Sequence, residues 1–105
     1  MTPATGSISA ADAIVQVESG GGWLLDVRED VEWQAGHAPG AHHIPMGEIG
    51  RRQDDLPDDE TILVICHLGG RSRMVTDALL AAGYPAANVE GGMEAWQAAG
   101  GPVLR

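Results

Sequence analysis

The feature that most constrains the fold is a cysteine placed between a strand pattern and a helix pattern, within residues 61–84. Residues 62–65 are apolar and rich in β-branched types, which predicts a strand buried on both faces of a sheet. From Arg71 onward the apolar residues repeat with the period of a helix, and Gly83 stands where such a helix would end. One apolar stripe is expected on this helix, formed by Met74, Val75, Ala78, Leu79 and Ala82. The only cysteine, Cys66, therefore lies on a short loop between the two elements.

The loop that follows Cys66 has the chemistry of an anion-binding site. The first turn of a helix has backbone N–H groups without internal partners, and the helix dipole adds partial positive charge there. Gly69 and Gly70 allow neighbouring amides to point into one concavity. Such a concavity favours the thiolate of a cysteine at its rim, and the thiolate is the nucleophilic form. Arg71 and Arg73 are expected to add positive charge nearby.

Two interpretations of Cys66 are open on these residues alone. A free cysteine often behaves as a small buried hydrophobe, and Cys66 could simply end the strand. The sequence Gly-Gly-Arg-Ser at residues 69–72 stands at a turn from strand to helix, which favours a reactive cysteine instead.

Strand and helix patterns alternate along the whole chain. Apart from the central pair, short strands are expected near Ile8 and at 23–27, 41–44 and 87–90, and helices at 10–19, 29–36, 47–56 and 94–99. Ser9 is the expected N-cap of the helix at 10–19, and the acidic Glu29, Asp30 and Glu32 suit the first turn of the helix at 29–36 because of the helix dipole. This alternation predicts an α/β fold, with a mainly parallel central sheet of about five short strands and helices on both faces. A chain of 105 residues supports a single domain, expected at 8–105 after a loose lead-in at 1–7. Functional loops of such sheets gather at the carboxyl ends of the strands, where Cys66 lies.

Charge and composition exclude several classes of partner. The net charge of −9 argues against nucleic acid, whose phosphates would be repelled. No apolar run reaches the roughly 18 residues of a membrane span. The first residues lack the basic and apolar stretches of an export signal, and a single cysteine suits a reducing compartment, so a cytoplasmic location is expected. The acidic run at 54–60 is either a solvated loop, which is favoured, or a docking site for a basic partner.

The histidines do not predict a metal site. His42 and His43 are adjacent in an expected strand, so they should point to opposite faces and not share an ion. His37 is expected to have a structural role in a turn. We therefore expect no metal ligand among these residues.

Several other polar and aromatic residues are given structural roles. Asp26 and Arg28 form either a structural ion pair, which is favoured, or a pair that orients the loop after Cys66. Trp33 and Trp96 are expected in the core or in the wall of a pocket, and Tyr84 is expected to cover the core.

Three groups of residues, in the same order along the chain, resemble motifs of one family. They are Leu-Leu-Asp-Val-Arg-Glu at 24–29 with Gly-His-Ala-Pro-Gly-Ala-His-His-Ile-Pro at 36–45, Cys-His-Leu-Gly-Gly-Arg-Ser at 66–72, and Glu-Gly-Gly-Met-Glu-Ala-Trp at 90–96 with Gly-Gly-Pro-Val at 100–103. In these motifs the chain resembles the single-domain rhodaneses, which are sulfurtransferases. One motif alone would be weak, but three in order span most of the chain.

The resemblance implies a rhodanese-like domain and a reaction. A sulfane sulfur would pass from thiosulfate, or from a low-molecular-weight or protein persulfide, to a thiol or cyanide through a persulfide on Cys66. No organic cofactor or metal is implied, and a sulfur-relay protein is a further candidate partner. The resemblance assigns substrate binding to His67, Leu68, Gly69, Gly70, Arg71 and Ser72.

Two other functions are weighed against sulfur transfer. Phosphatases and arsenate reductases of this fold have a loop one residue longer, and the four residues between Cys66 and Arg71 should make the present loop too tight for a tetrahedral oxyanion. Relay or sensor modules without turnover often lack the cysteine. Rhodaneses that specialise in thiosulfate often carry basic residues directly after the cysteine, where this chain has His67 and Leu68. The donor is therefore open between thiosulfate and persulfides.

Overall fold

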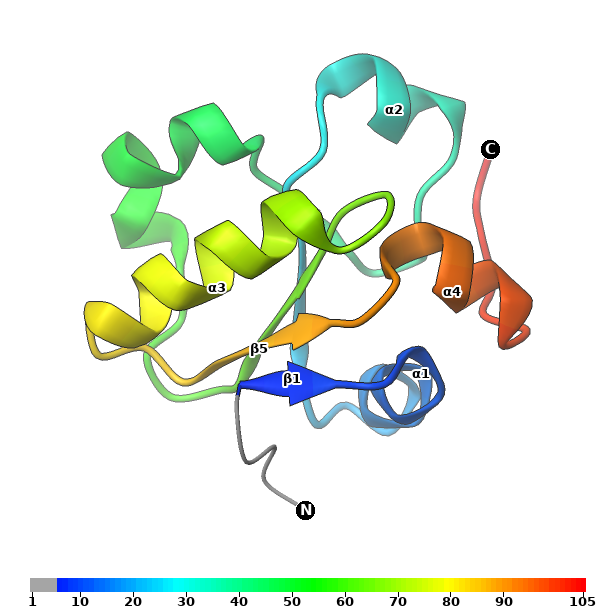
Figure 1. Cartoon of the computed structure of the whole chain (residues 1–105), viewed down its shortest axis with the longest axis horizontal. Helices are drawn as coiled ribbons and strands as arrows, with labels where there is room; N and C mark the ends of the chain where they lie inside the picture. Colours follow the sequence, from blue (N-terminus) through cyan, green and yellow to red (C-terminus); the bar gives the residue numbers. More distant parts are fainter. Residues whose placement is uncertain (1–5) are drawn as a thin grey trace.

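Five parallel strands form one sheet in the computed structural model, which describes residues 6–105 (Figure 1). The strands are β1 (Ser7–Ile8), β2 (Trp23–Asp26), β3 (His42–His43), β4 (Ile62–Ile65) and β5 (Ala86–Val89). Their order across the sheet is β1-β5-β4-β2-β3, and each neighbouring pair is parallel. The predicted α/β class is confirmed, and the strand before Cys66 lies at the centre of the sheet.

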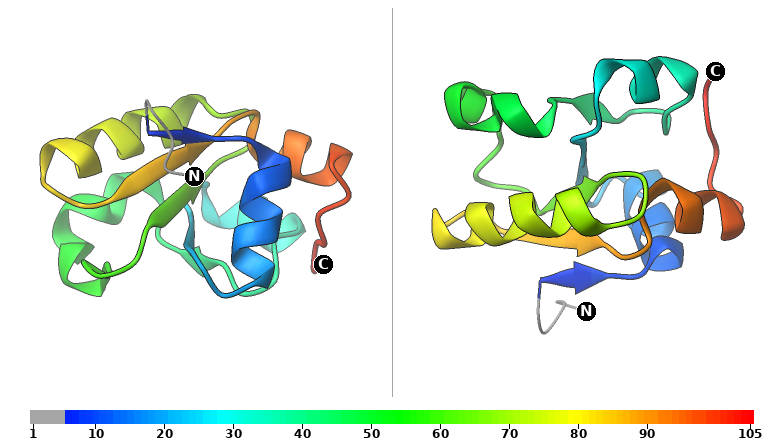
Figure 2. Two further views of the ribbon diagram at one scale, coloured as in Figure 1. Left: turned by 90° about the horizontal axis from the view of Figure 1, so that it is seen from below. Right: turned by 45° about the horizontal axis from the view of Figure 1, so that its top comes forward.

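The helices lie on both faces of this sheet, as predicted (Figure 2). They are α1 (Ala10–Glu18), α2 (Asp30–Ala35), the 3-10 helix η1 (Met46–Asp55), α3 (Gly70–Ala81) and α4 (Gly92–Ala98). Helices α1 and α4 cover one face, whereas α3 and η1 cover the other. Helix α2 lies beyond the carboxyl end of β2 (Figure 1), and its Glu32 contacts Arg71 at the start of α3. Within residues 6–105, no helix is both long and apolar enough to cross a membrane.

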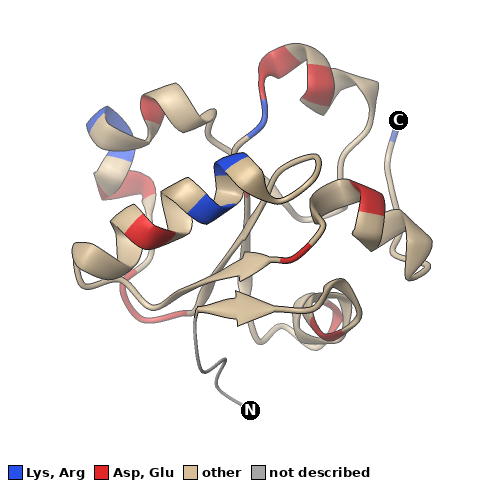
Figure 3. Ribbon diagram, viewed as in Figure 1, with Lys and Arg blue, Asp and Glu red and all other residues tan. Residues whose placement is uncertain are grey.

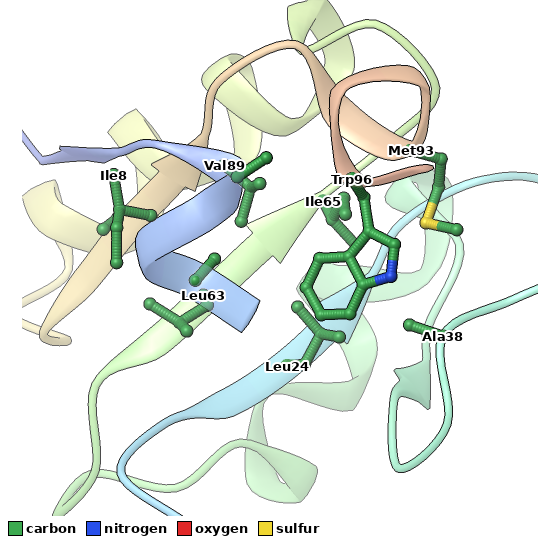
Figure 4. Close-up of a cluster of buried hydrophobic side chains, with 11 residues drawn as sticks. Ile8, Leu24, Ala38, Leu63, Ile65, Val89, Met93 and Trp96 are labelled. Carbon is green, nitrogen blue, oxygen red and sulfur yellow. The ribbon is translucent and has the colours of Figure 1, made fainter. Parts of the chain in front are cut away.

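The central strand contributes to two separate hydrophobic cores, because successive side chains of a strand point to opposite faces. Leu63 and Ile65 face α1 and α4, whereas Ile62 and Val64 face α3 and η1. Trp96 lies in the first core, where Figure 4 shows its indole together with the labelled aliphatic side chains. Its Nε1 donates to the carbonyl of Pro102 at 2.9 Å, so this buried polar group has a partner. The expected core position of Trp96 is confirmed.

Two predicted helix ends are formed by the residues that the sequence indicated. Ser9 caps α1, because its hydroxyl accepts a hydrogen bond from the amide of Asp12 at 3.1 Å. Gly83 has a φ of +92° after α3, and the amide of Tyr84 donates to the carbonyl of Leu79 at 2.9 Å. This is the Schellman arrangement, in which a residue in the left-handed region ends the helix. Tyr84 itself is partly buried against the second core, as expected.

The helix predicted at residues 47–56 is present, but it is not an α-helix. Met46–Asp55 forms a 3-10 helix, interrupted at Arg52, where φ is −114° and ψ is 26°. Gly47 and Gly50 disfavour an α-helix, and Ile49 is the buried residue of the segment. With so little apolar surface to bury, this segment follows the tighter and less regular path. At the other end of the chain, Ser7 belongs to β1 rather than to the predicted loose lead-in, and residues 1–5 lie outside the described residues.

The apolar stripe predicted for α3 is only half buried. Val75 and Leu79 lie in the second core, but Met74 is 65% exposed and Ala78 and Ala82 are exposed as well. These exposed positions line an apolar groove of about 420 Å³ between α3 and η1. The buried positions that complete the inner face of α3 are instead polar, namely Ser72 and Thr76.

Candidate functional site

Cys66 is the first residue after the central strand, at the carboxyl end of the sheet. The chain turns within three residues, and Gly69, with a φ of +107°, caps the beginning of α3. A residue with a side chain rarely adopts that φ, so glycine is needed to bring the helix N-terminus back toward the cysteine. The predicted placement of Cys66 between a buried strand and a helix N-terminus is confirmed.

The sulfur of Cys66 is surrounded by hydrogen-bond donors of its own loop. The amides of Gly69 and Ser72 donate to Sγ at 3.1 Å and 3.3 Å, and the Ser72 hydroxyl lies 3.2 Å from it. Cys66 is 1% exposed, as the interpretation of a buried hydrophobe requires, but these donors make its surroundings polar. Burial raises the pKa of the thiol, yet the bonds from Ser72 and from the amides of Gly69 and Leu68 outweigh it. The pKa of Cys66 is therefore lowered, and the thiolate persists to lower pH than in a free cysteine.

Replacement of Ser72 by alanine should raise the pKa of Cys66, because the thiolate then loses its hydroxyl donor. The rate of alkylation of Cys66 by iodoacetamide, measured against pH, should move to higher pH in Ser72→Ala. Thr76→Val is the matched control, since the Thr76 hydroxyl is buried one turn further along the same helix and has no hydrogen-bond partner among residues 6–105. An unchanged profile in Ser72→Ala would mean that the hydroxyl does not stabilise the thiolate.

The start of α4 holds the other side of the loop. The amide of Met93 donates to the carbonyl of Cys66 at 2.7 Å, and the amide of Glu94 donates to the carbonyl of His67 at 3.1 Å. Gly92 makes this approach possible, since its φ is +57° and an added Cβ would overlap the carbonyls of Cys66 and His67. With these carbonyls turned toward α4, the amides further along the loop face the sulfur.

Sequence reasoning assigned no role to this glycine, although it lies in the family-like motif at 90–96. The available signal was the pair of glycines at Gly91 and Gly92, directly before a helix, where a polar capping side chain is usual. Strand β5 adds a further contact, since Asn88 Nδ2 donates to the carbonyl of Gly69 at 3.3 Å.

Both arginines near the cysteine are paired with carboxylates, so the positive charge that was expected from them is compensated. Arg71 Nη1 and Nη2 donate to the two carboxylate oxygens of Glu32 in α2 at 2.6 Å and 2.8 Å. Arg73 is held by Asp77 at 2.7 Å and by the Ser7 hydroxyl at 2.8 Å. Figure 3 shows the basic positions at the start of α3 and the acidic positions of α2 above them. Sequence reasoning attributed Glu32 only to the helix dipole.

The Glu32–Arg71 pair changes the pKa of both side chains. The hydrogen bond from Arg71 lowers the pKa of Glu32 to about 2, and the bond to Glu32 raises the pKa of Arg71. Both groups therefore stay charged throughout the neutral range, and their charges compensate each other at the edge of the loop.

The remaining residues assigned to substrate binding lie on the outside of the loop. His67, Leu68 and Gly70 are exposed, and Leu68 is 61% exposed despite its apolar side chain. The structure thus brings Gly69 and Ser72 to the sulfur, joins Arg71 to α2, and leaves the other three residues at the surface.

Asp26 and Arg28 form a buried ion pair of 2.8 Å. Arg28 also donates to the carbonyl of Gly36 at 2.7 Å, which ties the end of β2 to the end of α2. These contacts favour the structural interpretation of the pair. The pair still affects the site indirectly, because it fixes the segment that carries Glu32.

Three of the four histidines stack on tryptophans. His42 stacks on Trp23, whereas His43 and His37 both stack on Trp33, with ring centroids 4.6 Å and 3.6 Å apart. Within residues 6–105, no three His, Cys, Asp or Glu side chains are grouped so that they could hold a metal ion.

A comparison with known protein families identifies the family of this chain. The sequence model of the rhodanese-like domain matches residues 9–99, which is most of the chain. The chain belongs to the rhodanese-like domain family. The resemblance expected from three ordered motifs is thereby confirmed.

Individual proteins similar to this rhodanese-like domain support the same family assignment. It is 44% identical over 75 residues to the Bacillus subtilis (strain 168) protein named "Putative sulfurtransferase YtwF", covering 71% of this chain and 73% of YtwF. It is 40% identical over 74 residues to "Putative sulfur carrier protein YrkF" of the same organism, covering 70% of this chain but only 40% of YrkF. Among solved structures, the rhodanese-related protein from Thermoplasma volcanium has a TM-score of 0.87 and 34% identity, covering 93% of this chain and 96% of that one.

Proposed function

We propose that this rhodanese-like domain is a sulfurtransferase that carries sulfane sulfur as a persulfide on Cys66. The observation that carries the proposal is a buried sulfur with two amides and one hydroxyl within 3.3 Å. These donors stabilise the negative charge of the Cys66 thiolate, which is the nucleophile of the first step and the leaving group of the second. The names of YtwF and YrkF, which refer to sulfur transfer and sulfur carriage, support the same chemistry.

The first step is attack of the Cys66 thiolate on the outer sulfur of a donor. With thiosulfate, a bond forms between Cys66 Sγ and the sulfane sulfur, the bond to the sulfonate sulfur breaks with its electron pair, and sulfite leaves. With an alkyl hydropersulfide, the leaving group is the alkyl thiolate. In both cases Cys66 becomes a persulfide, and no electron donor or acceptor outside the two reactants is needed.

The second step returns the free enzyme. Cyanide or a thiolate attacks the outer sulfur of the persulfide, the bond to Sγ breaks, and thiocyanate or a new persulfide is released as the Cys66 thiolate departs. The amides of Gly69 and Ser72 then hold the charge of the departing thiolate. Neither step requires an organic cofactor or a metal.

A relay role without multiple turnover is the second candidate, favoured by the name of YrkF as a sulfur carrier. In that case Cys66 would accept one sulfur and pass it only to a partner protein. Phosphatase or arsenate reductase chemistry has less support, because only four residues separate Cys66 from Arg71 and the Arg71 guanidinium is already bound by Glu32.

Mass spectrometry of the intact protein tests the proposal most directly. After mixing with thiosulfate or with glutathione persulfide, Cys66 is expected to gain the mass of one sulfur atom, and cyanide is expected to remove it. Repeated formation of thiocyanate identifies a turnover enzyme, whereas a stable persulfide that only a protein thiol removes identifies a relay. If no donor adds sulfur to Cys66, the proposed function is wrong.

A further inference from the structure

The one arginine of the Cys66 loop is already bound within the protein. Arg71 follows Gly70 directly at the beginning of α3, where a free guanidinium would attract an anionic substrate to the sulfur. Two of its nitrogens instead donate to both oxygens of Glu32, at 2.6 Å and 2.8 Å. Such a bidentate pair occupies the carboxylate-binding face of the guanidinium, so an anion would have to compete with Glu32 for it.

Glu32 is held in place by its own helix. It is the third residue of α2, and its Oε1 also accepts a hydrogen bond from the backbone amide of Glu29 at 3.0 Å. This capping box orients the carboxylate of Glu32 independently of its contact with Arg71. Both side chains of the pair are about two-thirds covered. The pair is therefore a preorganised part of the site edge and not a loose surface contact.

The surroundings of the pair suit an organic donor better than an inorganic dianion. Leu68, two residues after Cys66, is 61% exposed, so the outside of the loop offers apolar surface. The whole protein carries a net charge of −9, which repels a dianion such as thiosulfate. An alkyl hydropersulfide presents its outer sulfur without a charged sulfonate group beside it.

We infer that Glu32 determines the donor specificity of this site: by holding Arg71, it disfavours dianionic inorganic donors and leaves the cysteine to persulfides of organic thiols. The part of the inference that concerns sulfur donors rests on the proposed function. The effect of Glu32 on the charge near Cys66 does not depend on that function, because this charge can be measured with simple alkylating reagents.

The first experiment measures the charge felt at Cys66. Iodoacetate and iodoacetamide alkylate the same thiolate, but only iodoacetate is anionic, so the ratio of their rates reports the local potential. Glu32→Gln should raise the iodoacetate-to-iodoacetamide ratio about three- to tenfold at low ionic strength, because Arg71 is no longer neutralised. Asp30→Asn is the matched control: it removes one negative charge from the same helix, but Asp30 is exposed and lies beside His43 rather than Arg71.

Arg71→Gln should change the iodoacetate-to-iodoacetamide rate ratio in the opposite direction. It leaves Glu32 without its partner, so the same ratio should fall below that of the wild type. The double variant Glu32→Gln Arg71→Gln should return the ratio close to the wild-type value, which attributes both effects to this one pair. If neither single variant changes the ratio, or if Asp30→Asn changes it as much as Glu32→Gln, Glu32 does not control the charge at the cysteine and the inference is wrong.

The second experiment measures donor choice directly. The ratio of kcat/KM for thiosulfate to kcat/KM for an alkyl hydropersulfide should rise about three- to tenfold in Glu32→Gln and should not rise in the double variant. An unchanged donor ratio beside a changed alkylation ratio would overturn the role of Glu32 in specificity. If no donor transfers sulfur to Cys66 in the wild-type protein, the proposed function fails, and the donor assignment of Glu32 fails with it, whereas its alkylation result stands.

Discussion

Replacement of Cys66 by serine is expected to abolish sulfur transfer while leaving the fold nearly intact. Serine cannot form a persulfide, and its hydroxyl lacks the low pKa that makes the thiolate available, so turnover should fall by roughly a thousandfold or more, on the order of other nucleophile losses. The hydroxyl can accept the same bonds from the amides of Gly69 and Ser72, so the buried site keeps its partners. The measurements are thiocyanate formation from cyanide and thermal unfolding of the same samples.

Cys66→Ala serves as the control for packing. It removes the nucleophile as well, but it also leaves the two loop amides without an acceptor, so it should be less stable than Cys66→Ser. Sulfur transfer that survives in either variant would exclude the proposed mechanism. A fold that collapses in Cys66→Ser would instead assign the cysteine to the hydrophobic core.

Replacement of Gly92 by alanine should destabilise the fold strongly. The new Cβ would overlap the carbonyls of Cys66 and His67, and the φ of +57° is unfavourable for any residue with a side chain. Relief of the overlap requires α4 to move away and weakens the bonds from Met93 and Glu94 to the loop. Together these effects should reduce the free energy of unfolding by about 2–4 kcal/mol, which lowers the Tm by roughly 10–20 °C in a domain of this size.

The chain offers a matched control in Gly47→Ala. Among residues 6–105, no atom outside its two chain neighbours and the backbone of its own helix would lie within 4 Å of a Cβ added at Gly47, and its φ is not positive. Alanine there should therefore change the Tm little. In Gly92→Ala we also expect slower alkylation of Cys66 at neutral pH, because the loop amides no longer converge on the sulfur. Unfolding and alkylation that both match the wild type would show that α4 does not hold the loop.

The local parts of the fold and site were predictable because their signals lie in contiguous residues. An apolar run indicates the strand at 62–65, and a pair of glycines indicates the loop that follows Cys66. A change in the period of the apolar residues indicates the helix after the loop. The same holds for the Ser9 cap and the Gly83 stop, since each depends on a backbone position that few residue types occupy.

The parts that could not be predicted depend on contacts between distant segments. Glu32 and Arg71 are 39 positions apart, and nothing in either neighbourhood indicates that α2 approaches α3. The exposure of Met74 could not be read from the stripe either, because it depends on how much of α3 the irregular η1 covers. Periodicity identifies which side chains share a face, but the neighbouring element decides whether that face is buried.

The strand order has a consequence for the moment at which the thiol becomes reactive during biosynthesis. The central strand that ends at Cys66 is flanked by β2, which is made earlier, and by β5, which is made later and leads into Gly92 and α4. A ribosome-bound chain that has exposed Cys66 therefore still lacks the segment that orients the loop carbonyls. We expect the nascent cysteine to behave as an ordinary thiol until α4 has been synthesised and has docked, so that its reactivity reports the completion of folding.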